Sequence, residues 1–393
     1  MVSVPFLATA LSVGAGQYGF GLFIEPLEDD FGWNRSQISA SLSFTAFGSL
    51  IAPFLGRVMD RHGTKYIMAG SLGLIAFSYL LRPLMTELWH WYVLSFIQYL
   101  GAGAGFLPAG RLVGIWFQRN RGRVMGITAM GANFGGLVMP PFLGLILPML
   151  MWQGSYLVLA AISVALTVYA LVVISESPPV PSTGDETGET VTLETRPPLT
   201  GWTLREALRS RAFYAIALSI MLGSFTYSAI LPQIITHLTD EGVSVRVASL
   251  ALSTFAIFGM TGKLLMGILA ERITARYALM INLSGQAIFL VLIMWAGSPV
   301  IMWISVPLYG YFSGAFGALF QLVVQGAFGI RHYGSIMGTI GLTNMVSFGI
   351  GPILAGASVD LTGSYRIAFI TVAALFLVGA LSLTQARVPK PAP

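Results

Sequence analysis

Long apolar runs separated by short polar segments make up almost the whole chain. A helix that crosses a bilayer needs roughly 20 apolar residues, and runs of this length or more recur from one end to the other. We therefore predict an all-α membrane protein with twelve transmembrane helices, at approximately residues 4–27, 37–58, 65–84, 90–117, 123–149, 153–175, 212–237, 246–270, 276–297, 300–329, 334–360 and 364–385.

One long polar segment interrupts this pattern. Residues 176–211 are rich in Pro, Gly and Thr, a composition typical of a flexible linker. The segment leaves six apolar runs on either side. We therefore predict an N-terminal six-helix bundle (1–175), a cytoplasmic linker (176–211) and a C-terminal six-helix bundle (212–393).

Charged residues are few, and their placement indicates orientation. Only 9% of the 393 residues are charged and 55% are hydrophobic, whereas a soluble domain carries about 25% charged residues. This excludes a cytosolic enzyme and a nucleic-acid binder. Lys and Arg concentrate in the linker and in the loops after the second, fourth, eighth and tenth runs. By the positive-inside rule these segments and both termini are predicted to be cytoplasmic.

The inventory of reactive side chains argues against an enzyme, a metal centre or a cofactor. The chain has no Cys and four His, and no two of these His share a helical turn. It also lacks the Gly-x-x-x-x-Gly-Lys-Ser/Thr phosphate-binding motif, so energy must come from substrate or ion gradients. We predict no catalytic residue, no metal and no cofactor. We expect a monomer in a bacterial inner membrane.

The two halves repeat one another. GRVMDRHGTKY (56–66) corresponds to GILAERITARY (267–277), and RNRGRVMGI (119–127) corresponds to RHYGSIMGT (331–339). Pro141 and Pro352 follow in the same register. Each copy has six spans, so both copies begin on the same side of the membrane. Two parallel six-helix repeats that hold a substrate between them near the midplane form a transporter architecture.

A family resemblance rests on the first of these segments. Gly56 to Lys65 resembles the signature G-x-x-x-D-R-x-G-R-R of the major facilitator superfamily, with Lys65 where an Arg is usual. The second copy, from Gly267 to Arg276, has Glu271 for Asp and Thr274 for Gly. The resemblance covers essentially the whole chain. It implies alternating access by two rocking bundles.

A narrower resemblance is to the monocarboxylate porters and the oxalate/formate exchangers. It rests on FGLFIEPLEDDFGWNRSQIS (20–39), WFQRNRGRVMGITAMGANFGG (116–136) and GKLLMG (262–267). It implies that Lys263 stands where these porters carry a substrate-binding Arg. The porters also place an acidic residue one turn earlier. This chain has Gly259 there, which puts proton coupling in doubt.

The repeated motif is predicted to form a gate on the cytoplasmic side. Asp60 is expected to face the start of a helix near Gly334, and Glu271 the start of the helix that begins near residue 123. A solvated loop that only sets topology is the alternative. The predicted gating residues are Gly56, Asp60, Arg61, Gly63, Lys65, Gly267, Glu271 and Arg272.

Two cations are predicted to lie inside the membrane. Arg111 and Lys263 fall about 9 Å and 12 Å from the cytoplasmic edge at 1.5 Å per residue. No Asp or Glu lies in the middle of any predicted span. A buried cation without a counter-ion is costly and indicates a functional site, so an anionic substrate is predicted to supply the missing charge. Extension of either side chain to the headgroups is the alternative.

Other polar residues complete the predicted substrate site. The family resemblance implies that the first, fourth, seventh and tenth helices line the cavity. An interhelical hydrogen bond is the alternative role for each amide or phenol. The predicted substrate-binding residues are Lys263, Arg111, Tyr18, Gln17, Tyr227, Gln233 and Gln321.

The function predicted from these observations is secondary transport of small organic anions, with monocarboxylates as the first candidates and proton symport as one possible mode. Two alternatives stay open: a facilitator that exports hydrophobic drugs or metabolites, and a dicarboxylate/monocarboxylate exchanger.

Overall fold

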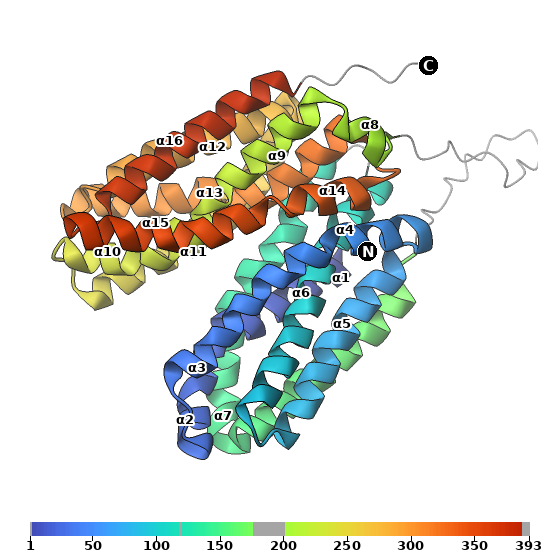
Figure 1. Cartoon of the computed structure of the whole chain (residues 1–393), viewed down its shortest axis with the longest axis vertical. Coiled ribbons are helices and arrows are strands. Elements are labelled where there is room, and N and C mark those ends of the chain that lie inside the picture. Colours follow the sequence, from blue (N-terminus) through green and yellow to red (C-terminus); the bar gives the residue numbers. More distant parts are fainter. Residues whose placement is uncertain (1, 118–119, 176–200, 387–393) are drawn as a thin grey trace, which may run out of the picture.

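The computed structural model describes residues 2–117, 120–175 and 201–386. This part of the chain is helical throughout, apart from one isolated bridge between Gly201 and Gly329. The predicted all-α fold is therefore confirmed, and Figure 1 shows its helices gathered into two groups. The linker residues 176–200 lie outside the described residues.

The first half begins with a broken helix. Ser3–Val13 and Ile24–Phe31 are α-helical, whereas Gly14–Tyr18 form a π-helix and Phe20–Phe23 a 3₁₀-helix, and the two parts are bent by 49°. The elements of this half are α1 (Ser3–Val13), η1 (Gly14–Tyr18), η2 (Phe20–Phe23), α2 (Ile24–Phe31), α3 (Arg35–Ala40), η3 (Ser41–Phe44), α4 (Thr45–His62), α5 (Thr64–Leu81), η4 (Arg82–Leu84), α6 (Leu88–Trp116) and α7 (Arg121–Val173).

The second half repeats this order after a short helix at the end of the linker. Its first span is again broken, by a π-helix and a 3₁₀-helix. The elements are α8 (Leu204–Leu208), α9 (Arg211–Gly223), η5 (Thr226–Ile230), η6 (Leu231–Gln233), α10 (Ile234–Asp240), α11 (Val245–Ile273), α12 (Ala275–Ile293), α13 (Pro299–Phe328), α14 (Tyr333–Gly341), α15 (Asn344–Thr362), α16 (Arg366–Ser382) and η7 (Leu383–Gln385).

The helix lengths are consistent with twelve spans. Within the described ranges, nine helices are long and apolar enough to cross a membrane, or ten when the bent pair Ser3–Tyr18 and Phe20–Phe31 counts as one. The 53-residue helix α7 is interrupted at Met151, where φ is 55°, so it contains two of the predicted spans. The succession α3, η3 and α4 accounts for the remaining one.

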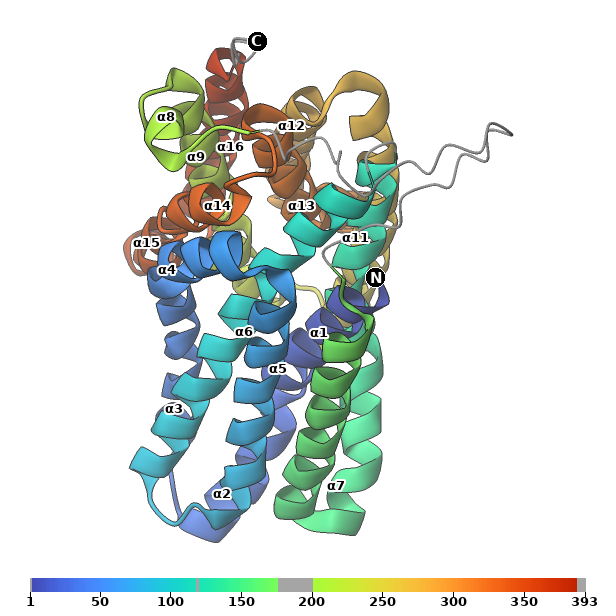
Figure 2. The same cartoon turned by 90° about the vertical axis from the view of Figure 1, so that its right-hand side faces the viewer.

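Two apolar cores hold the helices together. One joins α1, α2, α5, α6 and α7, and the other joins α9, α11, α12, α13 and α16 and also takes in residues of α4, α6 and α7 where the halves meet. The two groups meet where α4 lies against α14 and where α7 lies against α11. Figure 1 shows the helices of the two groups diverging from this junction, and Figure 2 shows α4 next to α14. The site therefore has to be sought at the junction and along the broken helices beside it.

Candidate functional site

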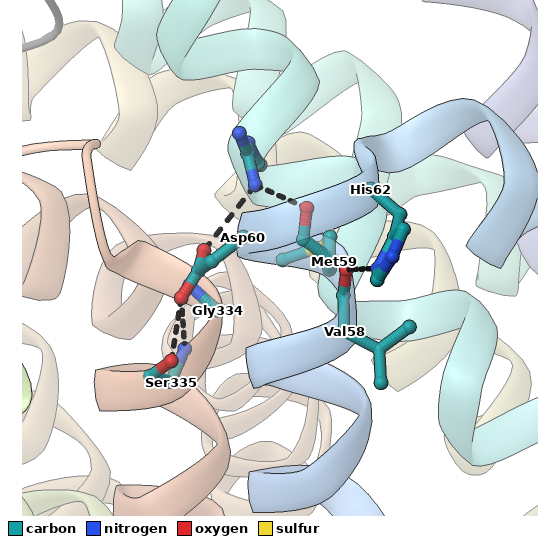
Figure 3. Close-up of polar contacts among 7 residues, drawn as sticks. Val58, Met59, Asp60, His62, Gly334 and Ser335 are labelled. Carbon is teal, nitrogen blue, oxygen red and sulfur yellow. Dashed lines mark hydrogen bonds and ion pairs between the residues drawn. The ribbon is translucent and has the colours of Figure 1, made fainter.

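The first junction, the α4–α14 contact, depends on a glycine and a carboxylate. A Cβ on Gly56 would collide with the carbonyl group of Gly334, so only glycine lets these helices approach so closely. One turn further on, the Asp60 carboxylate accepts hydrogen bonds from the backbone N–H of Gly334 (3.0 Å), the backbone N–H of Ser335 (2.8 Å) and the Ser335 hydroxyl (2.6 Å) (Figure 3). The carboxylate thus satisfies the free N–H groups at the start of α14.

Arg111 is the third member of this contact, and its position corrects a prediction. Its guanidinium donates to the Met59 carbonyl (2.5 Å) and lies 3.3 Å from Asp60 Oδ1. Both side chains are 6% exposed. The expectation that Arg111 lacks an acidic partner is therefore wrong. Asp60 belongs to the loop end of α4, but it extends to the depth of Arg111, which span boundaries read from the sequence do not show.

The remaining residues of the first motif shape the turn. Gly63 has φ of 91°, a value that glycine adopts at little steric cost. Arg61 is exposed and Lys65 is half-buried, so neither shares the buried contact of Asp60. Their predicted gating role stays a prediction.

The second junction, the α7–α11 contact, repeats this geometry with a more exposed ion pair. Gly122 and Gly267 meet so closely that a Cβ on either would collide with the other's carbonyl. Glu271 accepts the backbone N–H of Arg123 (2.9 Å) and pairs with its guanidinium (3.2 Å). Thr274 takes the place of Gly63 and has φ of 82°, so the turn survives the loss of its glycine. Arg272 is exposed.

Lys263 lies deeper in the α7–α11 contact. Its ammonium donates to the Ala129 carbonyl (2.9 Å) and to the Asn133 side-chain oxygen, both on α7. The residue is 7% exposed. No carboxylate in the described part of the chain lies within ion-pair distance of it. Lys263 is thus a buried cation held by neutral oxygen atoms across the two bundles.

The broken helices contribute the predicted polar residues of the first and seventh spans. Tyr18 ends η1, and Tyr227 occupies the corresponding π-helix η5 in the other bundle. Gln17 and Tyr18 are exposed, Gln233 is half-buried, and the Tyr227 hydroxyl donates to the Ser313 carbonyl (3.1 Å). Broken helices in matching places of two repeats mark the substrate region of many transporters.

Gln321 is placed differently. It is buried, and its oxygen accepts the Tyr333 hydroxyl (3.2 Å) beside Gly110. One turn further on, Gln325 donates to the Gly110 carbonyl (2.8 Å) and so joins α13 to α6. In this conformation Gln321 is part of the junction between the bundles and does not line an open surface.

Arg82, in η4 directly after α5, is a further buried cation. Its guanidinium donates to Gln98 (2.5 Å) and Ser95 (3.3 Å). It also lies over the rings of Trp91, Tyr156 and Tyr79, with centroid distances of 4.3, 4.5 and 5.5 Å. These rings stabilise the cation through their quadrupoles. The aromatic residues lie far apart in sequence, so only the clustering of Trp and Tyr near the ends of spans could have suggested this cage.

Two parallel helical repeats, each opening with a broken span, which meet through repeated carboxylate–helix contacts, define a secondary transporter. The Major Facilitator Superfamily matches residues 6–238 and 215–393 of the chain. The chain belongs to this family and is a multi-pass membrane transporter, not an enzyme.

Similar proteins show how broad this family is. The chain is 25% identical over 350 residues to Monocarboxylate transporter 12 of Rattus norvegicus, which covers 82% of this chain and 71% of the relative. It is 25% identical over 383 residues to the Hexuronate transporter of Bacillus subtilis (91% and 87%). A crystal structure of the E. coli fucose:proton symporter FucP has the same fold, with a TM-score of 0.77, 16% identity and coverage of 99% and 98%.

Proposed function

We propose that this transporter carries small organic anions, monocarboxylates first, by alternating access between the two bundles. The observation that carries the proposal is Lys263: a buried ammonium at the junction of the bundles with no acidic partner among the described residues. A charge placed there costs free energy unless it has a function. A carboxylate is the ligand that best completes its coordination.

The similar proteins support an acidic cargo. Monocarboxylates and hexuronates share a carboxylate, and these are the cargoes named for the two relatives. A lysine presents one compact charge and lacks the planar fork that binds both oxygens of a carboxylate. We therefore infer recognition of one carboxylate oxygen at this point. Gln17, Tyr18, Tyr227 and Gln233 would contact the remainder of the substrate.

The closed junction and the charge pattern complete the proposal. The side with the two carboxylate contacts is the side rich in Lys and Arg, which we assign to the cytoplasm. The described conformation then has its cytoplasmic gate closed. Arg111 belongs to this gate through Asp60. We further propose a monomer in the inner membrane.

Uptake into proteoliposomes tests the proposal. Radiolabelled L-lactate, pyruvate, oxalate and glucuronate serve as probes, with a neutral sugar as control. Lys263→Ala is expected to lower carboxylate uptake about 10–100-fold, because a hydrogen bond to a charged group contributes about 1.5–3 kcal/mol. Lys263→Arg is expected to restore part of the rate. Thermal unfolding of each variant verifies that it folds.

Two results would contradict the proposal. Full carboxylate uptake by Lys263→Ala would remove this cation from the substrate site. Competition by neutral hydrophobic compounds without competition by carboxylates would favour an exporter of drugs or metabolites instead.

A further inference from the structure

The place one helical turn before Lys263 is occupied from the other bundle. Position 259 on α11 is a glycine, and a Cβ there would lie 3.5 Å from the side-chain nitrogen of Asn133 on α7. The Asn133 amide lies in this space and has a hydrogen-bond partner on α11 for its nitrogen and another for its oxygen. Its nitrogen donates to the Ala256 carbonyl (3.1 Å), and its oxygen accepts the Lys263 ammonium. Turning the amide over would place its NH₂ group against the ammonium, so the orientation is fixed by its two partners.

The internal repeat shows that this use of an asparagine is specific to one half. Asn344 is the counterpart of Asn133 in the second copy, and its oxygen accepts the Ser224 hydroxyl (3.0 Å) within the same bundle. Asn133 instead binds two residues of the opposite bundle. Asn133 therefore connects the two bundles and does not only pack within its own.

The ammonium keeps room for one more ligand. A lysine donates three hydrogen bonds, and two acceptors are present here, Ala129 and Asn133. A carboxylate accepts a stronger hydrogen bond from a cation than an amide does. An anion that reaches Lys263 can therefore first accept the third hydrogen bond, and its stronger attraction for the ammonium then competes with that of Asn133. Because the two residues belong to different bundles, displacement of Asn133 removes a bond that closes the α7–α11 contact.

No titratable partner takes part in this exchange. Among residues whose side chains the structure describes, the other charged or titratable groups on the elements packed around Lys263 are Arg121, Arg123, Tyr156 and Tyr169 on α7, His237 and Asp240 on α10, Glu271 and Arg272 on α11, Arg276 and Tyr277 on α12, and Tyr309 and Tyr311 on α13. Arg123 and Glu271 pair with one another. In the described part of the chain, the hydrogen bonds of Lys263 go to the neutral acceptors alone.

We infer that Asn133 is the neutral counter-group of Lys263: the cargo anion displaces its amide, which releases the α7–α11 contact without a proton moving to or from the counter-group. This inference rests on the proposed function. An amide does not titrate, so the counter-group itself takes no part in proton coupling, and anion binding at this point couples to gate opening through a displaced hydrogen bond.

An aspartate of the same shape tests the absence of proton coupling. In Asn133→Asp an ionised carboxylate pairs with Lys263, and an entering anion must compete with it, which favours protonation of the aspartate. L-lactate uptake is measured at several values between pH 5.0 and 6.5, acidic enough to keep the Lys263 ammonium charged, and the pH is equal on both sides of the proteoliposome. The KM of this variant is expected to rise with pH, by up to about tenfold per unit. Wild type and the matched control Asn344→Asp are expected to show a flat KM.

Either of two results would overturn the inference. One is a flat KM for Asn133→Asp. The other is a wild-type KM that rises with pH as steeply as expected for the variant, since this would show a titrating group in the wild-type site.

A second measurement needs no cargo and separates this inference from the proposed function. The chain has no Cys, so two spin labels can be attached at His62→Cys, the exposed last residue of α4, and at Arg331→Cys, on the exposed loop before α14. Added to this pair, Asn133→Ala is expected to increase the population with a long label separation, and Asn344→Ala is expected to leave it unchanged. Unchanged separations in Asn133→Ala would refute the role of Asn133 in the contact. If Asn133→Ala shifts the label separation but the wild-type protein transports none of the tested carboxylates, the proposed cargo is refuted and the role of Asn133 in the contact stands.

Discussion

The two contacts that join the bundles share their backbone geometry and differ in where they place charge. At the α4–α14 contact, Asp60 and Arg111 are both almost fully buried, and Asp60 also accepts three hydrogen bonds from α14. At the α7–α11 contact, the corresponding pair is at the rim, with Arg123 51% and Glu271 15% exposed. The buried charge of this second contact is Lys263, which has only neutral acceptors among the described residues.

This difference suggests that the two contacts have different functions. A buried carboxylate with all its partners present closes the first contact, and no anion can improve on it. The second contact is held at its centre by an ammonium that a carboxylate binds more strongly than an amide does. The duplicated segments therefore close the two contacts in the same way. Lys263 is the residue that makes the α7–α11 contact sensitive to the cargo.

The largest effect is expected from breaking the buried pair. Asp60→Asn leaves Arg111 without its counter-charge and weakens the bonds to Gly334 and Ser335. Loss of one partner of a buried ion pair costs about 3–5 kcal/mol. Thermal unfolding in detergent should show a marked fall in Tm. Asp60→Asn/Arg111→Met, which removes both charges, should recover part of it, and a wild-type Tm for Asp60→Asn alone would contradict the assignment.

A smaller effect is expected from wedging the same contact open. Gly56→Ala places a methyl group against the Gly334 carbonyl, at a cost of about 1–3 kcal/mol for overpacking. The label separation between positions 62 and 331 should shift toward longer values. Gly73→Ala on α5 is the matched control, because a Cβ there meets nothing within 4 Å. Equal separations in the two variants would show that the glycine does not govern closure.

The smallest effect is expected at the rim. Glu271→Gln can still accept the N–H of Arg123, and a solvent-exposed ion pair contributes about 0–1 kcal/mol. Its Tm should fall by less than that of Asp60→Asn, and the difference from wild type should shrink further in high salt. A loss as large as that of Asp60→Asn would mean that the two contacts are equivalent after all.

The sequence predicts the fold well because its strongest signals are local or repeated. Apolar runs set the spans, and the duplicated GRVMDRHGTKY segment places Asp60 and Glu271 at the starts of α14 and α7. The isolation of Lys263 from acidic residues also follows from the sequence, since no acid lies near the middle of a span. The division at 1–175, 176–211 and 212–393 stays a prediction.

The remainder depends on contacts between distant residues. Arg111 and Asp60 are 51 positions apart, and their pairing requires the exact depth of a loop end beside a helix. Arg82 ends an apolar run and resembles a loop charge until Trp91 and Tyr156 surround it. Asn133 has an unremarkable place in the repeat, and only the packing of α7 on α11 brings it to Lys263.

A structure determined with a bound short-chain carboxylate tests the central claim most directly. Our account predicts a carboxylate oxygen within roughly 3 Å of the Lys263 nitrogen, with the Asn133 amide moved away from it. A carboxylate bound elsewhere, with Lys263 still on Asn133 and Ala129, would contradict the account.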